Sequence, residues 1–170
     1  MWPVAGVLVL MALVIAAIPG WIMWTNHQVW GDLGRAADDF GVPPGFTELQ
    51  RVRSGDAFCF VSCTNGGEAV LAVVFDTGSL SEDEACVRLE DAVRESVTSA
   101  GGNLEPPLGF FRCDFAGPLE GTMRVVGEVG LQSDLRCPDD VTGCGPRWTE
   151  DVPIPDLPLL AWVEFQSGIE

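Results

Sequence analysis

The chain contains no lysine, no tyrosine and only one histidine, His27. Serine and cysteine nucleophiles usually need a histidine base, and His27 stands beside an apolar N-terminal segment, away from candidate nucleophiles. Common catalytic and nucleotide-binding signatures (GxSxG, HExxH, the Walker loop and GxGxxG) are also missing. The sequence therefore carries no assembled catalytic set, and a binding role is a better expectation than an enzyme.

Charge is missing from the first part of the chain. No charged side chain occurs from Trp2 to Trp24, and most of this segment is aliphatic. As a helix it would extend about 33 Å at roughly 1.5 Å per residue, which matches a hydrocarbon core of about 30 Å. We therefore expect residues 1–25 to form a transmembrane anchor that contacts membrane lipid through residues 2–24. A cleaved signal peptide is the alternative, but the segment has neither a basic start nor a clear cleavage site.

All of the charged residues follow the anchor and give a net charge of −16. Nucleic acids and anionic lipid surfaces need a basic patch, so this charge argues against both as partners. Arg35, Arg51 and Arg53 follow the anchor and favour a cytoplasmic domain, whereas the cysteines favour an exported one. We give the cysteines more weight. The prediction is a single-pass protein of the cell membrane whose C-terminal domain is exoplasmic and meets a protein partner in the membrane or envelope.

Six cysteines occur in the exported part, and their even number predicts disulfides rather than a metal or cofactor site. They are Cys59, Cys63, Cys86, Cys113, Cys137 and Cys144. Cys59 and Cys63 would lie about 13 Å apart on one strand, too far to bond to each other. Cys86 and Cys113 would then take these two in an order that stays open, and Cys137 would pair with Cys144. A redox or copper site at the CxxxC spacing of Cys59 and Cys63 is the alternative.

Hydrophobic periodicity and turn residues predict the elements of this domain. A short helix begins at Asp32 and ends at Gly41, and a longer amphipathic helix runs from the Ser81 cap to Ala100. Strands are expected at 58–63, 69–75, 110–115, 122–129 and 159–165, with a further one at 48–52 and an Asn65-Gly66 hairpin turn after the first.

These elements predict an α+β fold in the order ββαβββ: a mostly antiparallel sheet with one main helix, in a small disulfide-rich domain behind the transmembrane helix. The expected organisation is the anchor at 1–25, a juxtamembrane helix with a Pro-rich linker at 26–45, and the exoplasmic domain at 46–170. In the expected register of the first hairpin, Cys59 stands opposite Ala72.

A family resemblance covers residues 30–100. The Pro-Pro-Gly-Phe of residues 43–46, the cysteines Cys59 and Cys63, and the helix containing Glu84-Ala85-Cys86 follow a single anchor. This layout resembles uncharacterised membrane-anchored exported proteins of actinobacteria. The resemblance implies a location and a lineage, and it implies no activity.

One motif could carry chemistry. Asp76-Thr77-Gly78 follows a hydrophobic strand, as in aspartic proteases, where two such aspartates share a proton and activate water. This chain has one copy, so the alternative function is a membrane-anchored, dimeric, retropepsin-like protease that uses Asp76. The other interpretation is a turn between a strand and a helix. We favour a binding or accessory module in the exoplasmic domain, with no catalytic residues.

Overall fold

The structure is a computed structural model that describes residues 2–54, 69–106, 113–130 and 159–167; within the first range, the side chains of residues 2–10, 12–16 and 19 are outside the described set. The elements in chain order are α1 (Trp2–Phe40), β1 (Thr47–Ser54), β2 (Val70–Asp76), α2 (Glu82–Ser99), β3 (Asp114–Pro118), β4 (Met123–Gly130) and β5 (Leu160–Ser167). The strands form a five-stranded sheet in the order β1-β2-β5-β4-β3, and every neighbouring pair is antiparallel.

This architecture confirms the α+β class and the antiparallel sheet. The strands β2, β4 and β5 overlap the strands predicted at 69–75, 122–129 and 159–165. The first described strand is β1, which contains the predicted additional strand at 48–52. The predicted strand at 58–63, the Asn65-Gly66 turn and the first half of the strand at 110–115 lie outside the described residues, and the end of that last strand overlaps β3.

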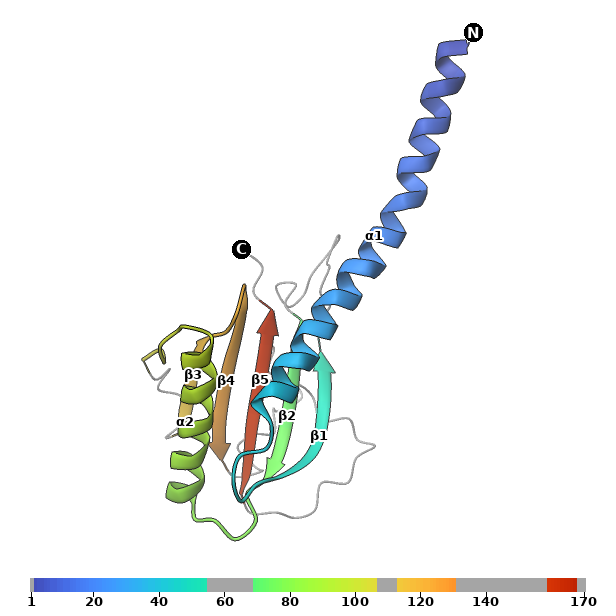
Figure 1. The fold of residues 1–170 in the computed structure, drawn as a ribbon. Helices are drawn as coiled ribbons and strands as arrows, with labels where there is room; N and C mark the ends of the chain where they lie inside the picture. Colours follow the sequence, from blue (N-terminus) through green and yellow to red (C-terminus); the bar gives the residue numbers. More distant parts are fainter. Residues whose placement is uncertain (1, 55–68, 107–112, 131–158, 168–170) are drawn as a thin grey trace, which may run out of the picture.

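Two helices cover one face of the sheet, rather than the single main helix expected (Figure 1). The C-terminal part of α1 lies over β2 and β5, and α2 lies over β4 and β3. Alternate strand residues point into the layer between helices and sheet, where Phe75, Val125 and Phe165 meet Leu89 and Val93 of α2 in one buried cluster. The core of the domain is therefore this layer.

The helix α2 begins and ends where the sequence predicts. The Ser81 hydroxyl accepts a hydrogen bond from the Glu84 backbone N–H at 3.3 Å, and the Glu84 carboxylate accepts one from the Ser81 N–H at 3.1 Å. These reciprocal bonds satisfy two N–H groups that the first turn leaves without helical partners. Gly101, with φ of 81°, ends the helix in a left-handed conformation that favours glycine. Glu90 and Arg94, four residues apart on α2, also form an ion pair.

The predicted helix start at Asp32 is wrong, because α1 runs without a break from Trp2 to Phe40. Asp32 pairs with Arg35 one turn later instead of capping a new helix. The predicted end is confirmed: Gly41 has φ of 67° and donates its N–H to the Ala37 carbonyl at 3.2 Å. The helix is thus one continuous rod from the N-terminal segment into the core.

The first half of α1 projects away from the domain (Figure 1). Among the described residues, no helix is both long enough and apolar enough to cross a membrane.

The contact between α2 and the sheet depends on glycines of the strands. A Cβ on Gly127 of β4 would lie 2.9 Å from Val93 Cγ2, and one on Gly117 of β3 would lie 2.7 Å from Val97 Cγ2. Both distances are shorter than ordinary carbon contacts of about 3.5–4.0 Å. These two positions therefore let α2 approach the strand backbone closely.

We predict that Gly127→Ala destabilises the fold by about 1–3 kcal/mol, because the new methyl group overpacks the contact with Val93. Gly34→Ala is the matched control: Gly34 lies within α1, and nothing stands within 4 Å of its added Cβ. We expect this control to stabilise the helix by about 0.5–1 kcal/mol. Urea denaturation of the full chain measures both changes, and a Gly127→Ala variant at least as stable as the parent would contradict the prediction.

Candidate functional site

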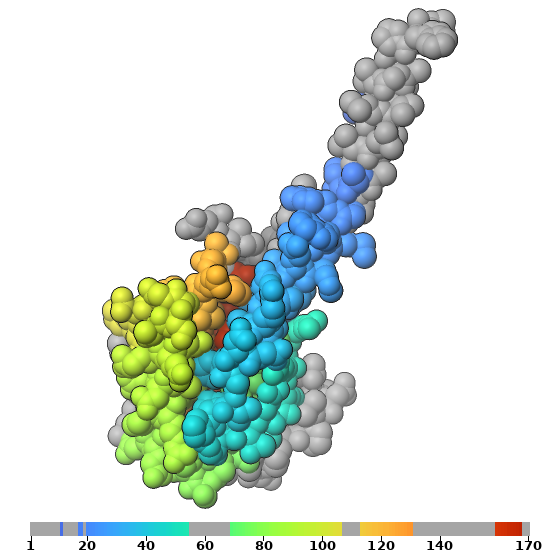
Figure 2. All heavy atoms as spheres, viewed as in Figure 1, coloured from blue at the N-terminus to red at the C-terminus, as the bar shows by residue number. Residues whose placement is uncertain are grey.

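A groove with a volume of about 940 Å³ lies between the C-terminal parts of α1 and α2. The space-filling view shows the furrow between the two helices, with the sheet at its base (Figure 2). The residues that line the groove are Asp32, Arg35, Ala36, Asp39, Phe40, Val42, Pro43, Pro44, Ala92, Glu95, Ser96, Ser99, Ala100, Leu119, Glu120, Gly121 and Met123. They come from both helices, the segment after α1 and the turn between β3 and β4. This groove is the candidate functional site.

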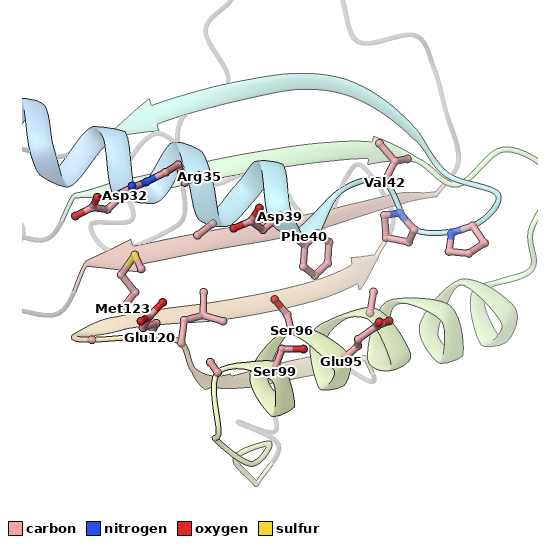
Figure 3. A pocket seen from close by; sticks show the side chains of 17 residues that line it. Asp32, Arg35, Asp39, Phe40, Val42, Glu95, Ser96, Ser99, Glu120 and Met123 are labelled. Atoms are coloured by element: carbon pink, nitrogen blue, oxygen red, sulfur yellow. Dashed lines mark hydrogen bonds and ion pairs between the residues drawn. The ribbon is translucent and has the colours of Figure 1, made fainter.

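The floor of the groove is apolar. Phe40 extends from α1 toward α2 (Figure 3), and its ring packs edge-on against Phe165 of β5, with ring centroids 5.7 Å apart. Leu119 is buried, whereas Met123 and Phe40 are only partly covered by the core. Partly covered apolar side chains at the base of a groove favour an apolar ligand group, because its arrival removes them from water.

The rim of the groove is acidic. Asp39 on α1, Glu95 on α2 and Glu120 on the turn before β4 are all exposed. None of them forms an ion pair with another described residue. The single cation of the lining is Arg35, and it pairs with Asp32. The rim therefore presents three carboxylates, from three different elements, toward one space.

One end of the groove is closed by the segment that links α1 to β1. Arg88 of α2 donates a hydrogen bond from Nη1 to the Pro44 carbonyl at 2.7 Å. Gly45, with φ of 86°, lies where a Cβ would stand 2.5 Å from that guanidinium. The Phe46 ring then packs against Phe75 in the core. This end wall is thus attached to α2 on one side and to the sheet on the other.

The α1 wall is fixed to the edge strand β1 by charged contacts. Arg51 donates to Asp38 at 2.5 Å and to Glu48 at 2.8 Å, and the Arg53 guanidinium lies 5.4 Å from the Trp30 ring centroid. The hydrogen bonds to Glu48 and Asp38 raise the pKa of Arg51 above its ordinary value. Exposed pairs of this kind add little stability each, and they connect α1 to the sheet in addition to the buried contacts of Leu33 and Ala37.

The structure places Asp76-Thr77-Gly78 at the end of β2 and in the turn that leads to α2, and none of the three lines the groove. The Asp76 carboxylate accepts a hydrogen bond from the Gly78 N–H at 2.7 Å, and the buried Thr77 hydroxyl donates to the Leu159 carbonyl at 3.1 Å. Gly78 has φ of 60°. Asp76 and Thr77 therefore form hydrogen bonds that stabilise the turn, and Gly78 adopts its left-handed backbone conformation.

The predicted disulfide pairing is wrong for Cys86 and Cys113. These two cysteines bond to each other, with their Cα atoms 5.6 Å apart, and so link α2 to the start of β3. Ala72, the expected neighbour of Cys59, pairs instead with Val52 of β1 and Glu164 of β5. Cys59, Cys63, Cys137 and Cys144 lie outside the described residues. The error arose from the predicted hairpin, in which the strand at 58–63 was expected to pair with the strand at 69–75. In the structure, β1 is paired with that strand.

Three carboxylates gather on the sheet face opposite the helices. Asp114 of β3 stands beside Glu128 of β4, and Glu164 of β5 is the third. Burial, followed by the negative charges of Glu164 and Asp114, raises the pKa of Glu128 to about 7. Burial also raises the pKa of Glu164, although its carboxylate accepts hydrogen bonds from Trp162 and Gln166. Among the described residues, no group of His, Cys, Asp or Glu could hold a metal ion.

The groove was missed by sequence reasoning. Ala92 and Ser96 of α2 are half-buried and border the groove. Small and hydroxyl residues at the edge of an apolar helix face were the available signal. No signal in the sequence marked the rim carboxylates, because acidic residues are frequent throughout the domain.

No family model, no curated protein and no solved structure matches this chain.

The raised pKa of Glu128 predicts how the stability of the fold depends on pH. Its pKa is about 7 in the folded chain and about 4.5 in the unfolded chain, so the folded chain binds more protons between these values. The stability that protonation of Glu128 provides is therefore complete below pH about 4.5 and is lost as the pH rises through about 7. Glu128→Gln removes this loss, and we expect it to stabilise the fold by about 1 kcal/mol at pH 8, allowing for the solvent-exposed part of the side chain.

Urea denaturation at several pH values measures this effect. Asp91→Asn removes an exposed carboxylate of α2 and controls for the change in net charge. A Glu128→Gln variant that keeps the full decline of stability between pH 4.5 and 8 would disprove the role of Glu128.

Proposed function

We propose that this chain is a single-pass membrane protein whose acidic α+β domain faces the exoplasmic side and binds a protein partner through the groove. The observation that carries this proposal is the groove itself, which combines a partly exposed apolar floor with three rim carboxylates that have no ion-pair partner among the described residues. Apolar contact area together with a few placed polar groups is the usual composition of a binding site.

Two features support the membrane anchor. The segment from Trp2 to Trp24 contains no charge, and α1 continues it into the core without a break. Five large apolar side chains on this part of α1 are exposed by 43–74%: Met11, Ile18, Trp21, Met23 and Trp24. Single exposed apolar residues are ordinary, but a concentration of them on a projecting helix favours contact with lipid or with another apolar surface.

The Cys86–Cys113 disulfide supports the exoplasmic side. Such bonds persist in oxidising compartments and are rare in the reducing cytosol. Because this bond joins α2 to β3, it stabilises the wall of the proposed binding site.

The described residues do not favour the alternative, a dimeric aspartic protease. The hydrogen bonds of Asp76, Thr77 and Gly78 within the turn account for the motif without catalysis. We therefore propose a binding or accessory module, without a cofactor.

The first test of the proposal is membrane extraction. We expect the full chain to stay in the membrane pellet after alkaline extraction, and its C-terminal domain to be digested by protease added to intact spheroplasts. The double variant Leu10→Arg and Val14→Arg should be released, because an arginine near a helix centre costs about 2.5–3.5 kcal/mol on insertion scales. Val87→Arg, at an exposed position of α2, is the control for added charge. Release of the parent chain by alkali would refute the anchor.

The second test is site-specific photocrosslinking in native membranes. A photoreactive residue at Ser99, in the groove, should give a discrete crosslinked adduct. The same residue at the exposed Val87 of α2, which is not part of the groove lining, should not give that adduct. Identical adducts from both positions, or no adduct from Ser99, would argue against a partner in the groove.

A further inference from the structure

We propose that the groove recognises a short basic segment of its partner, in which an apolar side chain occupies the floor and flanking arginine or lysine side chains meet the rim carboxylates. This inference rests on the proposed binding function and specifies the chemistry of the ligand.

The acidic rim of the groove indicates a positively charged segment in the partner. Asp39, Glu95 and Glu120 stand on three sides of one space, and Arg35 is already paired with Asp32 (Figure 3). A cation bound in this space is attracted by each of these carboxylates. The net charge of −16 also attracts basic partners from a distance, which raises the rate of encounter. Anionic ligands and acidic segments are disfavoured for the same reason.

The apolar floor of the groove indicates that the ligand also carries an apolar side chain. Phe40 and Met123 are partly exposed where they line the groove, and Leu119 lies beside them. Exposed ion pairs alone give weak and poorly specific binding, because water and salt screen them. Burial of an apolar side chain against this floor supplies the remaining affinity, and a methionine adapts its shape easily to such a group.

A peptide segment suits the groove better than a small cation does. The carboxylates are distributed around the opening on α1, α2 and the turn before β4, so that several cations, spaced along one ligand, can be bound together. The hydroxyls of Ser96 and Ser99 on the α2 wall can donate to or accept from a peptide backbone. A polyamine would satisfy the rim and leave the floor exposed to water.

The test measures the affinity of synthetic peptides for the full chain in detergent micelles, at low and at physiological salt. The main probe is a short blocked peptide that alternates arginine and leucine. One matched peptide replaces the leucines with serine, a second replaces the arginines with glutamine, and spermidine is the small-cation probe. We expect the main probe to bind most tightly, and its affinity to fall as salt rises.

Paired variants separate the groove from the overall charge. The double variant Glu95→Gln and Glu120→Gln removes two rim carboxylates, and the double variant Glu82→Gln and Asp91→Asn removes two exposed carboxylates of α2 outside the groove. Both leave the same net charge. We expect only the rim variant to weaken binding of the main probe, by about tenfold.

The outcomes distinguish this inference from the proposed function. Equal binding by the two double variants, or equal binding of the glutamine peptide and the main probe, overturns the basic segment even if Ser99 still crosslinks a partner. Equal binding of the serine peptide or of spermidine shows a simple cation site and overturns the apolar part of the inference. No peptide binding, together with no adduct from Ser99, removes both the inference and the proposed binding function.

Discussion

The packing of the C-terminal end of α1 against β2 and β5 is the contact on which the rest of the structure depends. Leu33 and Ala37 are buried in the main core cluster, and Phe40 meets Phe165 of β5. Full burial of a leucine side chain contributes about 1.5–3 kcal/mol. The same helix end supplies one wall of the groove, and its other end is the uncharged N-terminal segment. The position of the groove relative to that segment is therefore set by one continuous helix, without a hinge at a linker.

The position of α2 depends on a different constraint, which is the close approach of this helix to the backbone of β3 and β4. Gly117 and Gly127 leave room on the sheet for Val93 and Val97, and the disulfide between Cys86 and Cys113 attaches the helix to the adjoining strand. Because α2 is held at the β3–β4 side of the sheet and α1 at the β2–β5 side, the space between them is not closed by helix–helix packing along its whole length. The groove is the result of these two separate attachments.

Much of this fold could be predicted from the sequence, where the signals are local. The capping box at Ser81 and Glu84, the helix end at Gly101 and the alternation of β5 depend on neighbouring residues, and all are present. The Cys86–Cys113 pairing and the groove could not be predicted, because they depend on which strands are neighbours. In the sheet order β1-β2-β5-β4-β3, the last strand lies in the centre, and no local pattern specifies that insertion.

The insertion of β5 also explains why the carboxylates on the two faces of the sheet differ in their exposure to water. Glu164 enters the sheet centre with β5, beside Val126 and Ala72, and is half-buried there. Such a carboxylate is tolerated when it is protonated or hydrogen-bonded, which is what the raised pKa and the bonds from Trp162 and Gln166 indicate. The groove carboxylates stand on helices and a turn at the surface, where water solvates their charge. The half-buried acids therefore make the stability of the fold depend on pH, whereas the rim acids are exposed to water.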